Sequence, residues 1–88
     1  MDLKEKVKQA PTQPGCYLFK DAEGRIIYIG KAKAIRNRVK QYFMKTNQQD
    51  DKGLLLAKLI CDVEFLVTAT ERDALLEEYR LIKLHRPW

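Results

Sequence analysis

Two short segments with β-strand character, separated by a turn, constrain the fold of this chain more than any other feature. Residues 16–20 and 25–29 are rich in β-branched and aromatic side chains, and the sequence Asp-Ala-Glu-Gly between them is typical of a turn. The pattern predicts a β-hairpin. We therefore expect a small sheet in the N-terminal half of the chain.

Periodicity, capping and helix-breaking residues predict the other elements. Gly30 is expected to end the second strand, and Thr70 with Asp73 three residues later resembles a capping box at the start of the last helix. The predicted elements are helices over residues 2–10, 32–44, 54–60 and 71–85, and a third strand over residues 63–68. This order predicts an α+β domain in which helices pack on a small sheet.

Length and composition restrict the class of protein. Because a chain of 88 residues rarely holds two domains, we expect a single domain over residues 1–88. Two distant cysteines and one histidine make neither a disulfide framework nor a structural zinc site. No apolar run approaches the ~20 residues that span a bilayer, and no signal peptide is predicted. We therefore expect a cytoplasmic protein with reduced thiols and no membrane association through a spanning helix.

Basic side chains outnumber acidic ones and are concentrated in one stretch. The chain has 17 Lys and Arg residues against 12 Asp and Glu residues, a net charge of +5. Residues 31–45 contain no acidic residue, and their basic residues are Lys31, Lys33, Arg36, Arg38, Lys40 and Lys45. A solvated helix face is the plainer interpretation, but the single sign of the charge favours a polyanionic partner, either nucleic acid or an anionic membrane surface.

Two tyrosines of the predicted hairpin are candidates for proton transfer. If the turn is centred between residues 22 and 23, Tyr17 and Tyr28 lie opposite each other on one face of the sheet. An odd loop length would break that pairing, and an ordinary aromatic pair is the alternative interpretation. A phenol with an ordinary pKa near ~10 needs a nearby cation or metal ion to act at neutral pH.

Cationic groups close to the end of the second strand could bind a phosphate. Gly30 allows a tight turn, and Lys31 places a charge where the next helix is expected to begin. Such a pair is weak evidence by itself. Arg38 lies four residues before Tyr42, at the edge of the apolar stripe of that helix, so it is the basic residue best placed to face the sheet.

A glutamate in the last predicted helix is surrounded by apolar positions. On a helical wheel Glu78 falls within a stripe made by Ala74, Leu75, Leu81 and Ile82. A buried carboxylate needs a cation, a hydrogen-bond donor or a metal ion. The alternatives are an ion pair with Arg38 or Lys31, or a stripe less clear than the wheel indicates. His85, two turns later on the same side, is expected to be a polar cap or a surface residue.

Together these residues resemble the GIY-YIG nuclease family. Its name motif stands here as Gly15-Cys16-Tyr17 and Tyr28-Ile29-Gly30. Three longer strings are similar to the branch of that family found in UvrC, the bacterial excision-repair nuclease subunit: Pro-Gly-Cys-Tyr-Leu-Phe-Lys-Asp, Ile-Tyr-Ile-Gly-Lys-Ala-Lys and Leu-Ile-Lys-Leu-His-Arg-Pro. The resemblance covers nearly the whole chain and implies a three-stranded antiparallel sheet flanked by helices, the GIY-YIG fold.

The resemblance also implies a role for each matching residue. Glu78 takes the position of the only direct protein ligand of one Mg²⁺ or Mn²⁺ ion, whose other ligands are water and phosphate oxygens. Tyr28 takes the position of the general base, and Tyr17 supports the site. Arg38 is expected to hold the scissile phosphate. Two further active-site positions are matched by Lys31 and Tyr42. Beside these, the basic stretch makes Lys33, Arg36 and Lys40 candidates for contacts with DNA.

The implied function is metal-dependent hydrolysis of a DNA phosphodiester bond by a monomeric endonuclease domain. In UvrC this is the incision 3′ to a lesion in nucleotide excision repair, a DNA-damage and SOS response that involves UvrA and UvrB. Cys16 and Arg80 depart from the family pattern. Because the family continues past Trp88 to an asparagine, we expect either a domain excised from a longer chain or a stand-alone nuclease outside excision repair. A basic module that docks on nucleic acid without cleaving it is the alternative of another class, and it would not need Glu78.

Overall fold

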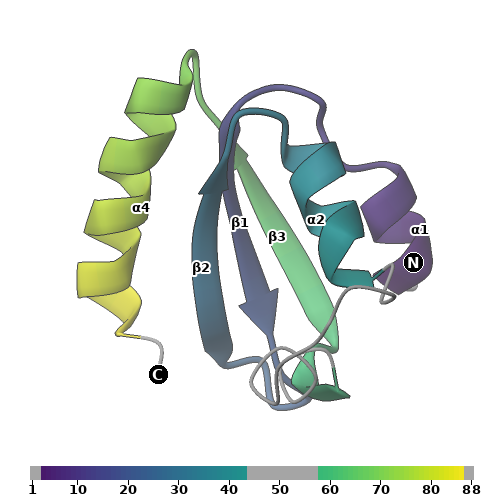
Figure 1. The fold of residues 1–88 in the computed structure, drawn as a ribbon. Coiled ribbons are helices and arrows are strands. Elements are labelled where there is room, and N and C mark those ends of the chain that lie inside the picture. Colours follow the sequence, from purple (N-terminus) through teal and green to yellow (C-terminus); the bar gives the residue numbers. More distant parts are fainter. Residues whose placement is uncertain (1–2, 44–57, 87–88) are drawn as a thin grey trace.

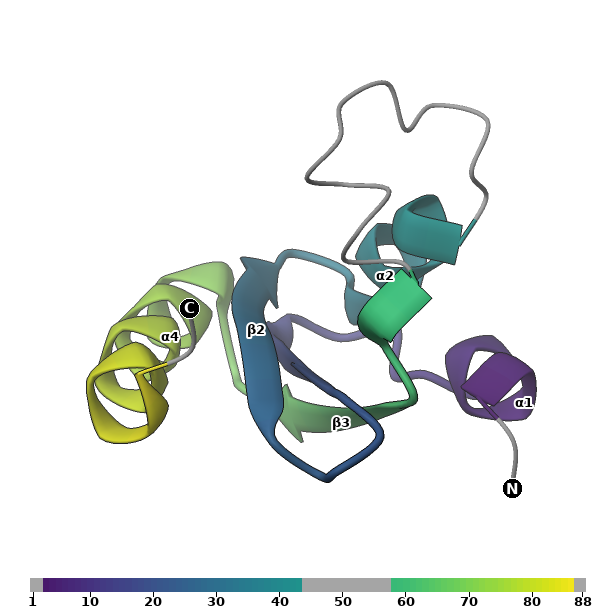
Figure 2. The same ribbon diagram turned by 90° about the horizontal axis from the view of Figure 1, so that it is seen from below.

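A three-stranded sheet lies between helices on both of its faces in the computed structural model, which describes residues 3–43 and 58–86 (Figure 1). Helix α4 (Glu71–His85) packs on one face. Helices α1 (Leu3–Lys8) and α2 (Ile35–Phe43) cover the other face, as the view from below also shows (Figure 2). The predicted helix over residues 54–60 falls mostly outside the described residues. No helix within the described ranges is long and apolar enough to cross a membrane.

The sheet confirms the predicted fold class. Strand β1 (Gly15–Lys20) is central, and it pairs antiparallel with β2 (Ile26–Ala32) on one side and with β3 (Asp62–Val67) on the other. Strand β2 therefore forms an edge of this sheet. At the top of Figure 1, the end of β2 lies between the starts of α2 and α4, which brings three segments distant in sequence to one corner.

The register of the hairpin differs from the prediction. Tyr17 pairs with Gly30, and Tyr28 pairs with Phe19, so the predicted pairing of the two tyrosines is wrong. The loop is one residue longer than assumed, because the Asp21 carboxylate accepts hydrogen bonds from the backbone N–H groups of Glu23 and Arg25, at 3.0 and 2.9 Å. An irregularity at the Phe19–Lys20 step shifts the register by one more residue. A total shift of two leaves both tyrosines on the same face.

Strand β2 is longer than predicted, and α2 begins later. Gly30 does not end the strand, because Gly30, Lys31 and Ala32 continue the ladder opposite Tyr17, Cys16 and Gly15. Helix α2 begins only at Ile35. Lys31 therefore lies within a strand, and the predicted start of a helix directly after Gly30 is wrong.

The two faces of the sheet carry separate hydrophobic clusters. The α1/α2 face is the larger and contains Val7, Ala10, Tyr17, Phe19, Ile27, Ala32, Ile35, Val39, Ile60 and Val63. The α4 face contains Cys16, Leu18, Ile29, Ala74 and Leu81. Helix α4 begins as predicted, since the Thr70 hydroxyl accepts a hydrogen bond from the Asp73 backbone N–H at 3.1 Å.

Candidate active site

The phenol of Tyr17 is built into the α1/α2 face of the sheet. Its side chain is only 1% exposed, and its hydroxyl accepts a hydrogen bond from Nε of Arg38 at 3.4 Å. Gly30 lies opposite on β2, and a Cβ atom there would collide with the Tyr17 phenol. The glycine of the second motif therefore makes room for the tyrosine of the first, which explains in steric terms why the two motifs occur together.

Tyr28 and Arg38 join Tyr17 on this face. The half-buried ring of Tyr28 has its centroid 6.1 Å from that of Tyr17 and 6.0 Å from that of Phe19. Arg38 comes from α2 and is exposed, so its guanidinium reaches both the Tyr17 hydroxyl and solvent. The structure thus brings together three of the predicted residues. Tyr42 belongs to α2, but its side chain lies outside the described residues.

A hollow of about 700 Å³ opens beside these groups, at the corner where the end of β2 meets α2 and the start of α4. It is lined by Lys31, Ala32, Lys33, Ala34, Asn37, Arg38, Gln41 and Glu71. Lys31 and Arg38, which lie on opposite faces of the sheet, therefore border one space. Three cationic side chains and one anionic side chain line it, so the hollow attracts anions.

Glu78 lies on the other face of the sheet, over β1. The Cys16 thiol donates a hydrogen bond to the Ala74 carbonyl oxygen at 3.2 Å, which fixes this turn of α4 above β1. Burial first, and then the negative charges of Glu78 and Glu77, raise the pKa of the Cys16 thiol to about 11. The carboxylate of Glu78 is half-buried and lies close enough to Cys16 for its charge to act on the thiol.

The stripe around Glu78 is narrower than the helical wheel indicates. Ala74 and Leu81 are buried, but Leu75 is 48% and Ile82 is 40% exposed. The expectation that these two residues belong to the buried stripe is wrong, because α4 contacts β1 and β2 along one narrow line and leaves its next face in solvent. Glu78 therefore lies at the border of the packed surface, where water and a ligand can reach it.

Neither of the alternative cation partners neutralises Glu78. Lys31 pairs with Glu71 instead, at 3.2 Å, and Glu78 forms no hydrogen bond or ion pair with any described residue. The neighbouring Glu77, by contrast, pairs with Arg80 at 2.7 Å. Within the described ranges, no group of three or more His, Cys, Asp and Glu side chains could hold a metal ion. A single carboxylate suits a hard cation that keeps several water ligands, such as Mg²⁺.

The three predicted DNA contacts have different surroundings. Lys33 and Lys40 are exposed, and Lys33 lines the hollow. Arg36 donates a hydrogen bond from Nε to the Ala10 carbonyl oxygen at 2.8 Å, so its guanidinium ties α2 to the end of α1 instead of extending freely into solvent. A contact of these side chains with DNA stays a prediction.

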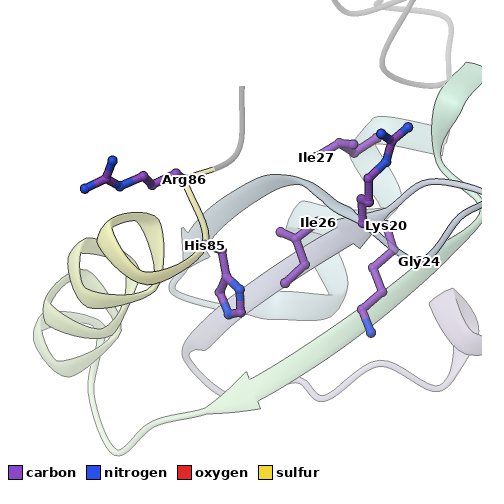
Figure 3. Close-up of a pocket in the computed structure, with 7 residues that line it drawn as sticks. Lys20, Gly24, Ile26, Ile27, His85 and Arg86 are labelled. Carbon is purple, nitrogen blue, oxygen red and sulfur yellow. The ribbon is translucent and has the colours of Figure 1, made fainter.

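A second basic hollow lies at the far end of α4 (Figure 3). It measures about 570 Å³ and is lined by Lys20, Gly24, Arg25, Ile26, Ile27, His85 and Arg86. The His85 ring points toward Ile26, whereas the Arg86 side chain points away from the sheet (Figure 3). His85 is exposed, as predicted for a surface residue, and the C-cap of α4 is the backbone of Arg86, whose N–H donates to the Ile82 carbonyl oxygen at 2.8 Å.

Sequence reasoning missed three residues that line the first hollow. Asn37 and Gln41 flank Arg38 on α2, and their spacing of four places them on one side of the helix. The two polar residues on either side of Arg38 in the sequence could have indicated a binding surface. Glu71 had no such signal, because an acidic residue in the first turn of a helix is ordinary. Only the contact with Lys31 reveals it.

Known proteins match this arrangement closely. The sequence profile of the UvrC-like GIY-YIG domain matches residues 13–88. This chain belongs to that family. It is 49% identical over 87 residues to the UvrABC system protein C of Symbiobacterium thermophilum. The aligned region covers 99% of this chain and 14% of that protein. A second relative, from Bdellovibrio bacteriovorus, is 50% identical over 86 residues. The chain therefore spans about one seventh of the length of these relatives.

The fold also matches a solved structure over most of both chains. The GIY-YIG N-terminal endonuclease domain of UvrC from Thermotoga maritima, bound to its catalytic magnesium ion, superposes with a TM-score of 0.82. The two sequences are 39% identical, and the match covers 96% of this chain and 90% of the other. The GIY-YIG fold predicted from the sequence is thereby confirmed.

Proposed function

We propose that this GIY-YIG domain is a divalent-metal-dependent DNA endonuclease that hydrolyses a phosphodiester bond. The observation that carries the proposal is Glu78, a half-buried carboxylate with no counter-ion among the described residues, on the helix whose first turn borders the hollow lined by Lys31, Lys33 and Arg38. A module that only docks on DNA has no use for an unneutralised carboxylate there, since it would repel the phosphates. The magnesium-bound Thermotoga domain supports the same interpretation.

The chain's own groups account for binding and proton transfer. Arg38 presents a planar guanidinium to a phosphate in the hollow, and its bond to the buried Tyr17 hydroxyl fixes the orientation of that guanidinium. Tyr28 is proposed to accept the proton of the attacking water as the new bond to phosphorus forms and the bond to the leaving sugar oxygen breaks. A cation held by Glu78 supplies positive charge and Lewis acidity at the phosphate when bound.

The wider role follows from the relatives. They are named as protein C of the UvrABC system, and this chain corresponds to a small part of them. We infer that the domain makes the incision 3′ to a lesion in nucleotide excision repair and works with UvrA-type and UvrB-type proteins. The three cationic side chains of the hollow are directed at phosphates, which carry no sequence information, so we infer little sequence preference in the isolated domain.

The deciding experiment compares two adjacent glutamates. Glu78→Gln should reduce nicking of a supercoiled plasmid in Mg²⁺ or Mn²⁺ by about a hundredfold or more. Glu77→Gln is the matched control, because Glu77 lies on the same turn of α4 with similar burial, and it should stay within about threefold of wild type. Glu78 has no described partner to lose, so both variants should stay folded by circular dichroism.

A metal titration keeps the test valid if the isolated domain cleaves weakly. Mn²⁺ added to the ¹⁵N-labelled domain should broaden resonances around Glu78, and Glu78→Gln should abolish that broadening while Glu77→Gln preserves it. Equal nicking by both variants, together with broadening spread over surface acids, would contradict the nuclease proposal and favour a docking module. Binding of the variants to DNA in EDTA should equal that of wild type within about twofold.

A further inference from the structure

The hollow beside the active site contains one anionic side chain among its cations. Oε2 of Glu71 lies 3.2 Å from Nζ of Lys31, whereas Lys33 and Arg38 line the same space. The side chains of the pair are 34% and 49% exposed, so water and a phosphate group can reach both. An acidic side chain in a phosphate-binding hollow repels the phosphate and weakens its binding. The presence of Glu71 there therefore requires an explanation.

An ordinary explanation for Glu71 is the first turn of α4. Acidic residues there interact favourably with the helix dipole, and both Glu71 and Asp73 occupy this turn. The dipole does not explain the direction of Glu71, which reaches across to β2. Seven residues separate Glu71 from Glu78, so the two lie on the same side of α4, about two turns apart. The ion pair thus holds Lys31 on the side of the sheet where Glu78 lies.

We propose that Glu71 is a positioning residue, which holds Lys31 in the DNA-free domain and releases it to a DNA phosphate on binding. This inference rests on the nuclease function proposed above. Two anions compete for one ammonium group, and a phosphate prevails when it also contacts Arg38 and Lys33 in the hollow. Backbone phosphates that touch only the rim lack those additional contacts and leave the pair intact. Glu71 therefore selects for a phosphate seated fully in the hollow, at a cost in overall affinity.

The test compares the affinities of Glu71→Gln and Asp73→Asn for a fluorescently labelled DNA duplex of about 20 base pairs. Binding is measured in EDTA by fluorescence anisotropy, over a series of salt concentrations. Both variants remove one charge from the same helical turn. Glu71→Gln should bind about threefold to tenfold more tightly, because Lys31 no longer has to leave a partner. Its plot of log K against log salt should keep the wild-type slope, because Lys31 contacts the same phosphate in both complexes. Asp73→Asn should change affinity by less than about twofold.

A double-variant cycle isolates the contact with Lys31. In a Lys31→Gln background, Glu71→Gln should lose its gain in affinity. A gain that persists without Lys31, or an equal gain for Asp73→Asn, would overturn the proposal. A purely structural role would lower the unfolding free energy in both single variants without any coupling to Lys31.

Failure of this inference is separable from failure of the nuclease function. A normal loss of nicking in Glu78→Gln with no coupling between Lys31 and Glu71 rejects only the positioning role. Absence of DNA binding by the wild-type chain rejects both.

Discussion

The two faces of the sheet are packed to different extents. On the α1/α2 face, large side chains are almost fully buried, among them Tyr17, Phe19, Ile35, Val39 and Val63. On the α4 face the cluster is half as large, and α4 leaves between 40% and 66% of several apolar side chains exposed: Leu75, Leu76, Tyr79, Ile82 and Leu84. Because buried apolar area contributes about 25 cal/mol per Å², the cluster on the α1/α2 face contributes more to stability than the cluster on the α4 face.

The proposed catalytic groups are divided between these faces. Tyr17, Tyr28 and Arg38 stand on the well-packed side, where the core fixes their geometry. Glu78 stands on α4, which packs on the smaller of the two hydrophobic clusters and leaves several apolar side chains exposed. Under the proposed function, the groups that would orient the phosphate and the carboxylate that would hold the metal ion are thus supported by separate parts of the core.

Core truncations on the two faces should show the largest difference. Ile35→Ala, on the α1/α2 side, should lower the free energy of unfolding by an amount near the top of the range of about 2–5 kcal/mol for such changes. Leu81→Ala, on α4, should fall near the bottom of that range, because Leu81 is 7% exposed and has fewer buried neighbours. Urea denaturation at equilibrium measures both. Equal losses would show that the two faces are packed equally well.

Sequence reasoning recovered the fold because strand composition, helix periodicity and the Thr70 cap all act locally. It failed in the hairpin register, since the turn length depends on the carboxylate of Asp21 and on an irregularity at Phe19. It also placed the end of β2 at Gly30, a glycine that is needed for the space of the Tyr17 phenol and not for a turn. Local patterns do not encode such contacts between distant residues.

The candidate site was predictable where a side chain contradicts its local pattern. Glu78 is a carboxylate at an otherwise apolar set of positions on α4, and in the structure it is half-buried and acts electrostatically on Cys16. The pair of Lys31 and Glu71 was not predictable, because it joins a strand to the first turn of a helix 40 residues away. Its existence depends on how α4 crosses the end of β2, which only the packing of the whole domain determines.

The α4 face should also be sensitive to alkaline pH through Cys16. The pKa of this thiol is about 11 in the folded state against an ordinary value of 9.0, mainly because of burial. The unfolded chain therefore loses this proton first. The free energy of unfolding should fall by roughly 2–3 kcal/mol as the pH rises from about 9 to about 11. Denaturation across this range should show the loss in wild type and in Cys61→Val, whose cysteine is exposed, but not in Cys16→Val. An identical slope in Cys16→Val would contradict the assignment.

On the well-packed face, a single methyl group should be harmful at Gly30. Gly30→Ala places a Cβ against the Tyr17 phenol, and overpacking of this kind costs about 1–3 kcal/mol. NMR should show displaced Tyr17 resonances together with the loss of stability. Gly24→Ala is the comparison, because its turn has a φ of 81° but no atom within 4 Å of the added Cβ. That variant should show backbone strain and leave the Tyr17 resonances in place; a Gly30→Ala protein with unmoved Tyr17 resonances would refute the steric argument.

The substitution with the smallest expected effect on stability tests the start of α4. Thr70→Ala removes the hydroxyl that accepts from the Asp73 N–H and should lower stability by about 1 kcal/mol. Because α4 packs on the smaller hydrophobic cluster, hydrogen exchange should accelerate in its first two turns, while the amides of β1 and α2 keep the protection of the whole fold. Thr70→Ser retains the cap and serves as the control. Uniform acceleration across all elements in Thr70→Ala would mean that α4 unfolds only with the entire domain, and that Glu78 is then positioned as rigidly as Arg38.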